Sequence, residues 1–208
     1  MTNKEFKEKF NRENLFKTGV DIDVVVDVQK DFITGALANA EAAKRVGRIA
    51  STIEEHCKHG GLLYLTMDTH YQNYLDTLEG RNLPVQHCIK YSQGWNIAPE
   101  VNDVLCRVNS NQFEFIKKSA FGSTTLASAI VSKLESFGLQ GHEIKNNINK
   151  IRVYGFCTDI CVISNAMILR SEFPNVEIEV LSDCCAGTTK ESHDTALLAM
   201  KQCMIEIS

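Results

Sequence analysis

The sequence predicts an α/β protein of three layers, in which helices cover both faces of a mainly parallel central sheet. β-Branched and aliphatic segments, such as the one at 21–29, alternate along the chain with segments whose apolar residues recur at helical spacing. The strand-like segments show little alternation of polar and apolar residues, which is typical of strands covered on both faces. Repeated strand–helix alternation of this kind folds as a parallel sheet with right-handed crossovers.

The individual elements follow from the same patterns. The predicted strands are residues 21–29, 62–68, 112–118, 151–156 and 176–183, with a short last strand at 204–208. The predicted helices are residues 38–61, 123–138, 159–173 and 189–203. A Gly-Gly pair ends the first of these helices, and Ser123 or Thr124 is expected to cap the second. Residues 69–100 and 140–150 are irregular or polar and are predicted to be loops.

The bulk properties describe one globular domain. The chain has 208 residues, of which 44% are hydrophobic and 23% charged, and its net charge is −4, so it carries no basic footprint for nucleic acid or anionic lipid. Its apolar runs are far shorter than the roughly 20 residues of a membrane helix. The charged N-terminus lacks the apolar core of a secretory signal, so a cytoplasmic protein is expected. The expected organisation is a helical extension over 1–20 and one α/β domain over 21–208.

Reactive side chains are predicted to converge on one edge of the sheet, because they follow or end the first four strands. These side chains are Asp27, Asp31, Asp68, His70, Lys117, Lys118, Cys157 and Cys161. Ligands of open parallel sheets bind beyond the carboxyl ends of the strands. This edge is therefore the expected functional site.

Cys161 is predicted to be a nucleophile. It lies in the first turn of a predicted helix, where the dipole and free backbone N–H groups favour a thiolate, and an acid and a base come from other strand ends. For Cys157 the simpler interpretation, a small buried apolar residue, is kept. The chain has eight cysteines without zinc-ribbon spacing, and reduced thiols are expected. A redox pair is disfavoured, because the spacing is C-x-x-x-C and not C-x-x-C.

Four short motifs occur in order on this topology: VVVDVQKDF, DTH with a later HC, KKSAFGS, and GFCTDICV. Together they resemble the signatures of the isochorismatase-like cysteine hydrolases, and within that superfamily those of the nicotinamidase branch. The resemblance runs from about Asp21 to the C-terminus and leaves the first 20 residues outside. It implies the isochorismatase-like hydrolase fold for residues 21–208.

The resemblance implies a catalytic triad of Asp27, Lys118 and Cys161. Cys161 would attack the carbonyl carbon of an amide, and Asp27 would take the thiol proton and pass it to the leaving nitrogen. Lys118 would keep Asp27 charged and stabilise the thiolate. The family also implies a cis peptide bond between Phe156 and Cys157, which would aim the backbone N–H groups of Cys157 and Cys161 into an oxyanion hole.

The resemblance also implies a metal site. Asp68, His70 and His87 offer one carboxylate and two imidazoles, a set that suits Zn²⁺, Fe²⁺ or Mn²⁺. In nicotinamidases the matching residues hold a divalent metal that binds the pyridine nitrogen of the substrate. Many members supply a further histidine where this chain has Asp76, and Glu79 is the expected substitute. A divalent metal, with Zn²⁺ first, is therefore the expected cofactor.

Other residues are less specific. Phe32 matches an aromatic residue that stacks on the substrate ring in the family, with core packing as the competing interpretation. Pro84 stands where many members carry a tryptophan. His56 and His59, near the end of the helix at 38–61, are expected to be exposed, and His193 is expected to be a structural helix residue.

The activity that the resemblance implies is conversion of nicotinamide to nicotinate and ammonia through a cysteine thioester. One alternative is another hydrolase of the superfamily, acting on an N-carbamoyl or ureido compound or on isochorismate, although the metal set and Cys161 argue against these. A second is a non-catalytic homologue that binds a small molecule. A small-molecule substrate, no nucleic-acid or membrane partner, and a homo-oligomer are expected.

Overall fold

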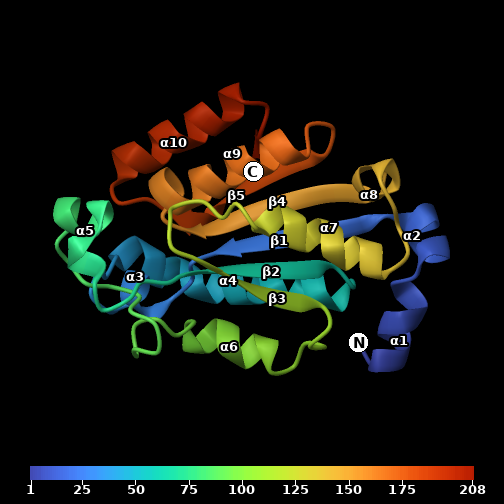
Figure 1. Cartoon of the computed structure of the whole chain (residues 1–208), viewed down its shortest axis with the longest axis horizontal. Coiled ribbons are helices and arrows are strands. Elements are labelled where there is room, and N and C mark those ends of the chain that lie inside the picture. Colours follow the sequence, from blue (N-terminus) through green and yellow to red (C-terminus); the bar gives the residue numbers. More distant parts are fainter.

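The computed structural model describes all 208 residues and has a six-stranded sheet at its centre (Figure 1). The strands are β1 (Val20–Val26), β2 (Leu62–Asp68), β3 (Phe113–Lys118), β4 (Ile148–Phe156), β5 (Glu177–Ala186) and β6 (Glu206–Ile207). They lie in the order β3-β2-β1-β4-β5-β6, and every neighbouring pair is parallel. The predicted fold class is confirmed, and the sheet is wholly parallel.

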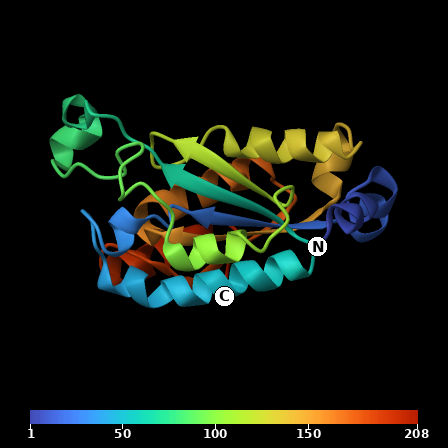
Figure 2. The same cartoon turned by 90° about the horizontal axis from the view of Figure 1, so that it is seen from below.

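Helices connect the strands. They are α1 (Asn3–Lys9), α2 (Arg12–Thr18), α3 (Lys30–Ile33), α4 (Ala40–Lys58), α5 (Leu78–Asn82), α6 (Pro99–Leu105), α7 (Leu126–Ser136), α8 (His142–Asn146), α9 (Ile163–Glu172) and α10 (Lys190–Gln202), with single turns η1 (Tyr74–Asp76) and η2 (Thr158–Val162). The chain crosses the sheet in one direction through α4 and α6 and in the other through α7 and α9. Right-handed crossovers place these pairs on opposite faces, and Figure 2 shows α4 and α6 on one side and α7 on the other.

The core lies on both faces of the sheet. Every residue of β2 is buried, and so is every residue of β1 except Asp21. This is the reason that these strands lack polar alternation in the sequence. Along β1 and β2, polar side chains that solvent or a ligand can reach are therefore expected mainly at the strand ends, whereas the edge strand β3 is exposed along much of its length.

The first two helices pack at the end of the molecule opposite α5 (Figure 1). The rings of Phe6 and Phe10 lie 5.8 and 5.0 Å from the ring of Phe137, which follows α7. Leu15 of α2 is completely buried. The extension therefore belongs to the hydrophobic core, and β1 begins at Val20.

The loop predictions are wrong in part. α5 lies within the predicted loop 69–100, and α6 starts at the end of that loop, with Pro99 in its first turn, and packs its apolar side on α4. α8 lies within 140–150, where burial of Ile144 stabilises a five-residue helix that the polar sequence hides. The cap predicted for α7 is also wrong. The helix begins at Leu126, and Ser123 instead donates its backbone N–H to Asn165.

The prediction that His56 is exposed is wrong, because its side chain is only 3% exposed. The Nε2 atom lies 2.8 Å from the carbonyl oxygen of Leu62, and Nδ1 lies 3.0 Å from Nη2 of Arg152. The helix-end pattern could not reveal this burial, since the partners come from β2 and β4. His59 is exposed, as predicted.

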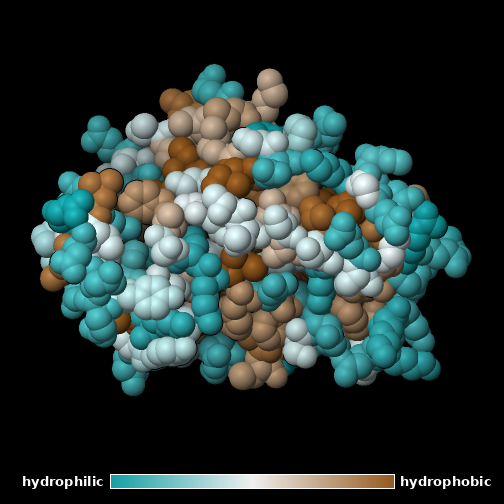
Figure 3. Space-filling view, in the orientation of Figure 1, coloured by the Kyte–Doolittle hydropathy of each residue, from teal (hydrophilic) through white to brown (hydrophobic).

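The surface is polar with scattered apolar groups. Figure 3 shows hydrophilic residues over much of this face and brown groups at the end that carries α5. At this end, Leu75 of η1 and Leu78 of α5 are 47% and 71% exposed. No helix in the structure combines the length and apolarity required to cross a bilayer.

Candidate active site

Asp27, Lys118 and Cys161 meet at the carboxyl edge of the sheet. Asp27 directly follows β1, Lys118 is the last residue of β3, and Cys161 lies in η2 after β4. The Nζ atom of Lys118 lies 2.6 Å from Oδ2 of Asp27 and 3.4 Å from Sγ of Cys161. All three side chains are buried. The structure thus brings together the three residues that the motif resemblance implies as a catalytic triad.

The backbone at Asp27 is held in an uncommon conformation. Its φ is +50°, a left-handed value that aspartate tolerates better than most residues. Thr66 of β2 holds it from two directions. The Thr66 hydroxyl donates to Oδ1 of Asp27 at 2.7 Å, and the Asp27 N–H lies 3.2 Å from both the hydroxyl and the carbonyl oxygen of Thr66. Such conformations persist where their surroundings over-determine them and are concentrated at functional sites.

Burial controls the charge state of this cluster. It raises the pKa of the Asp27 carboxyl above its ordinary value, although Lys118 opposes the shift. Burial, followed by the negative charge of Asp27, also raises the pKa of the Cys161 thiol well above its ordinary value. Burial alone would lower the pKa of Lys118, but nearby negative charge, that of Asp27 first, outweighs it and raises that pKa. Burial and the charge of Asp27 thus favour the thiol form of Cys161, in opposition to the helix position, which favours a thiolate.

The turn before Cys161 contains the cis peptide bond between Phe156 and Cys157 that the resemblance implies. The preceding Gly155 has φ +129°, and a Cβ there would lie 2.1 Å from the carbonyl oxygen of Val26. Only glycine fits this approach of β4 to β1. The backbone N–H of Cys157 makes no hydrogen bond to another backbone group, so it is available to a ligand.

Asn165 supports this turn and was missed by sequence reasoning. Its side chain is completely buried, donates to the carbonyl oxygen of Cys161 at 2.8 Å, and accepts from the N–H of Ser123 at 2.9 Å. Asn165 therefore joins the cysteine turn to the loop after Lys118. An asparagine inside a helix, four residues after the cysteine and followed by an apolar run, is the signal that could have revealed it.

Four potential metal ligands lie beside the triad. The ligand atoms of Asp68, His70 and His87 all lie within 4.8 Å of one another. Oδ2 of Asp68 is 3.0 Å from Nε2 of His70 and 3.4 Å from Nε2 of His87. Oε1 of Glu79 is 3.6 Å from each Nε2 atom. In a tetrahedral site with bonds of ~2.1 Å, ligand atoms are separated by about 3.4 Å, so these spacings fit a metal such as Zn²⁺.

The protonation of these ligands also fits a metal. Nδ1 of His87 bonds the carbonyl oxygen of Val85 at 2.8 Å, which leaves Nε2 with a free lone pair. Nε2 of His70 is buried and makes no hydrogen bond. Burial raises the pKa of Asp68, but the adjacent His70, His87 and Lys118 outweigh it and hold that pKa below its ordinary range. Asp68, His70 and His87 thus offer a carboxylate and two imidazole nitrogens whose lone pairs are not used up by hydrogen bonds within the protein.

Two further buried residues hold the metal ligands and were also missed. The side-chain amide of Gln29 accepts from the N–H of Asp68 at 2.7 Å and donates to the carbonyl oxygen of Asp68 at 2.9 Å. Asp31 accepts from the N–H of Cys88 at 2.7 Å and so fixes the residue after His87. The sequence placed Asp31 at the edge of the sheet without a role, and nothing in it identified the partner of Gln29.

A cavity of about 530 Å³ opens onto both clusters. It is lined mainly by apolar side chains, among them Phe32, Leu83, Phe121 and Ile160. Its wall also carries Cys161 and three of the potential metal ligands, Asp68, Glu79 and His87. The ring of Phe32 is buried and lies edge-on to His87, with centroids 5.8 Å apart. Lys117, in contrast, points away from the triad and lies over Trp95. The cavity suits a small, flat organic molecule.

An α/β sheet with this edge chemistry defines a class of hydrolases, and comparison with known proteins places the chain within it. The model of the isochorismatase domain matches residues 22–208. The chain belongs to the isochorismatase family of hydrolases. Among curated proteins, none matches this sequence.

Solved structures with the same fold include three amidases. The chain is similar to the pyrazinamidase of Pyrococcus horikoshii in complex with zinc, with 24% identity, a TM-score of 0.71, and coverage of 90% of this chain and 98% of that one. It is similar to the pyrazinamidase/nicotinamidase of Streptococcus mutans, with 20% identity, a TM-score of 0.75, and coverage of 90% and 99%. It is similar to the N-carbamoylsarcosine amidase of Thermoplasma acidophilum, with 24% identity, a TM-score of 0.68, and coverage of 91% and 95%.

Proposed function

We propose that this protein is a metal-dependent amidohydrolase that converts nicotinamide and water to nicotinate and ammonia. The observation that carries the proposal is the junction of two clusters in one apolar cavity. Cys161 lies 3.4 Å from Lys118 on one side of that junction, and Lys118 lies 3.5 Å from the metal-ligand candidate Asp68 on the other. The nucleophile Cys161 and the metal site that would orient the pyridine ring of the substrate thus lie a short distance apart.

Asp68, His70, His87 and Glu79 are the residues that hold the metal in this proposal. A divalent metal bound there supplies a Lewis-acidic position for the ring nitrogen of the substrate. Phe32 presents an aromatic surface to the same ring from the cavity wall. Together these residues turn the carboxamide of the substrate toward Cys161.

The first chemical steps belong to Cys161 and Asp27. Because the resting sulfur keeps its proton, Asp27 removes that proton as Sγ attacks the carbonyl carbon. The carbon–sulfur bond forms, and the carbonyl oxygen becomes an oxyanion that accepts hydrogen bonds from the backbone N–H groups of Cys157 and Cys161. Asp27 then gives the proton to the amide nitrogen. The carbon–nitrogen bond breaks, and ammonia leaves a thioester on Cys161.

Water completes the cycle. Asp27, again a carboxylate, takes a proton from the water that attacks the thioester carbon. The carbon–sulfur bond breaks, the proton returns from Asp27 to the sulfur, and nicotinic acid leaves and ionises to nicotinate in solution. Lys118 remains an ammonium ion throughout, because the anions around it raise its pKa. Its role is to offset the charge that moves between Asp27 and Cys161.

Ammonia release from nicotinamide by the metal-replete protein tests this proposal. We expect turnover by the wild type, none by Cys161→Ala, and wild-type turnover by the matched control Cys106→Ala, whose thiol is exposed and outside the cavity. Absence of turnover by the wild type contradicts the choice of substrate. Release of ammonia from an N-carbamoyl amino acid instead would favour the alternative amidase.

A further inference from the structure

Two side-chain contacts fasten the cysteine turn to the connection between β5 and α10. Thr158, the residue after Cys157, is completely buried, and its Oγ1 atom lies 2.7 Å from Nδ1 of His193 on α10. The carboxylate of Asp159 accepts a hydrogen bond from the backbone N–H of Thr188 at 2.9 Å and another from the Thr188 hydroxyl. None of these four side chains takes part in the steps of the proposed reaction. The contacts link a different strand and helix to the turn.

The structure around His193 is built to hold its ring in this position. α10 starts with a reciprocal capping box between Thr189 and Ser192, which fixes the first turn of the helix. The connection packs closely on the histidine, since a Cβ at Gly187 would lie 2.8 Å from Cβ of His193. A glycine is therefore required for the β5–α10 connection to approach the helix, and the histidine ring is left directed at Thr158.

We propose that His193 is a positioning residue for the amidase reaction, an inference that rests on the proposed function. By holding Thr158, it fixes the backbone segment that presents the N–H groups of Cys157 and Cys161. Thr188 supports the same segment through Asp159. Donors of an oxyanion hole act only within about 2.7–3.1 Å of the developing charge, and a misplacement of ~1 Å costs up to ~10²-fold in rate. His193 thus has a role in catalysis without touching the substrate.

A merely structural histidine predicts a different result from a positioning one. Loss of a helix–turn contact that only supports the fold lowers the stability of the protein and leaves kcat of the folded fraction unchanged. Loss of a positioning contact lowers kcat with little change in KM, because the oxyanion forms only after substrate has bound. The two roles also differ in the response of the turn itself, which becomes mobile only if His193 restrains it.

The test compares four variants and one control variant with the wild-type protein. His193→Ala and Thr158→Val each remove one partner of the hydrogen bond, and the double variant removes both. His193→Asn is the conservative change, because its amide reaches the position of Nδ1. His142→Ala is the matched control, since that histidine is exposed on α8 and outside the cavity. Backbone amide hydrogen exchange of peptides from residues 157–162 and from β1 is measured beside kcat and KM for nicotinamide.

We expect the exchange of residues 157–162 to accelerate at least tenfold in His193→Ala and in Thr158→Val, with exchange of β1 unchanged. We expect kcat to fall about tenfold in both, less than the ~10²–10³-fold for loss of an oxyanion donor itself, with KM within about threefold. The double variant should be no worse than the single ones, because both act through one contact. His193→Asn should recover most of kcat.

Unchanged exchange in the turn overturns the inference, and so does faster exchange with wild-type kcat or an additive loss in the double variant. A wild type that does not hydrolyse nicotinamide contradicts the proposed function instead. In that case the exchange measurement still decides whether His193 restrains the turn, because it requires no substrate.

Discussion

Asp23 in β1 and Asp27 just beyond it are both completely buried, and each faces a cation from another strand. The surroundings of Asp23 are saturated. Arg152 donates to its two oxygens at 2.7 and 2.8 Å, and the Tyr154 hydroxyl donates at 2.7 Å. The surroundings of Asp27 consist of one hydroxyl, one ammonium and a neighbouring thiol. Asp27 can accept and release a proton, because these partners do not occupy its carboxylate as fully as those of Asp23 do.

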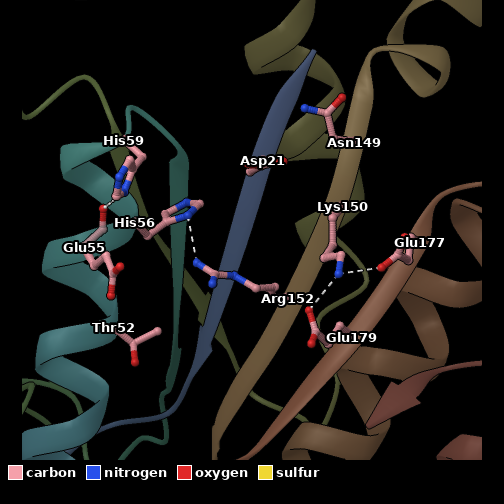
Figure 4. Close-up of a pocket in the computed structure, with 10 residues that line it drawn as sticks. All are labelled: Asp21, Thr52, Glu55, His56, His59, Asn149, Lys150, Arg152, Glu177 and Glu179. Atoms are coloured by element: carbon pink, nitrogen blue, oxygen red, sulfur yellow. Dashed lines mark hydrogen bonds and ion pairs between the residues drawn. The ribbon is translucent and has the colours of Figure 1, made fainter. Parts of the chain in front are cut away.

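The saturated cluster extends into a polar groove of about 470 Å³ between α4 and the strands (Figure 4). Arg152 reaches toward His56 there, and Lys150 is paired with Glu177 and Glu179. Each of these charged groups already has a protein partner. Buried networks in which every member is satisfied rigidify a fold. The comparison therefore separates a structural cluster from one whose members remain available to a substrate.

The largest expected effect is that of Asp27→Asn. An asparagine keeps the shape of the side chain but cannot take the thiol proton, so kcat should fall about 10³-fold, within the usual range for a general base. The folded fraction should remain close to that of the wild type. Steady-state kinetics and a denaturant titration measure the two quantities. A kcat within tenfold of wild type contradicts the assignment of Asp27 as the base.

Removal of the metal should have the next largest effect on activity. Chelation should abolish nicotinamide hydrolysis, and added Zn²⁺ should restore it, because the ring nitrogen loses its anchor. His87→Ala should lower the affinity for Zn²⁺ more than tenfold, whereas the exposed His59→Ala should bind Zn²⁺ as the wild type does. Metal titration measures this affinity without turnover. Equal affinity in the two variants would sink the assignment of the site.

Asp23→Asn should show the opposite pattern to Asp27→Asn. It leaves the guanidinium of Arg152 without its counter-charge, which should cost about 3 kcal/mol of stability. The folded fraction should keep the kcat of the wild type. Denaturant unfolding gives the first quantity, and activity per folded molecule gives the second. A stable protein with lower kcat would mean that the cluster around Asp23 is coupled to the reaction.

A smaller effect concerns pH. Asp27 must be a carboxylate to act as a base, and burial raises its pKa, so kcat/KM should fall as the pH drops through a value above the ~3.9 of an ordinary aspartate. Lys118→Met removes the cation that lowers this pKa and should move the acidic limb to higher pH. The pH profile of kcat/KM checks both statements. A limb that moves to lower pH contradicts the charge arrangement.

The smallest expected effect is that of Phe32→Leu. The leucine keeps an apolar wall but loses the aromatic face, worth about 1 kcal/mol. KM for nicotinamide should rise about fivefold, with kcat nearly unchanged. Steady-state kinetics separate the two terms. An unchanged KM would return Phe32 to the role of a core residue.

The types of the main elements and the positions of residues at strand ends could be predicted from the sequence. Contacts between residues far apart in the sequence could not. Strand–helix alternation predicted the parallel sheet, and the rule for strand ends brought Asp27, Lys118 and Cys161 to one edge. The contact of His56 with Arg152 and the hydrogen bond of His193 with Thr158 each join residues that are at least 35 positions apart in sequence and lie on different elements. Periodicity along one element holds no information about such contacts. The short helices α6 and α8 were hidden for the same reason, since packing rather than propensity stabilises them.

Trapping of the acyl group reveals whether a thioester forms on Cys161. Nicotinamide is supplied to the metal-replete protein in the presence of hydroxylamine, which attacks thioesters in competition with water. We expect nicotinohydroxamate to form at the expense of nicotinate while ammonia release continues, and Cys161→Ala to form neither product. Nicotinate as the sole acyl product, at hydroxylamine concentrations that cleave a free thioester, would contradict the covalent mechanism and indicate direct attack by water.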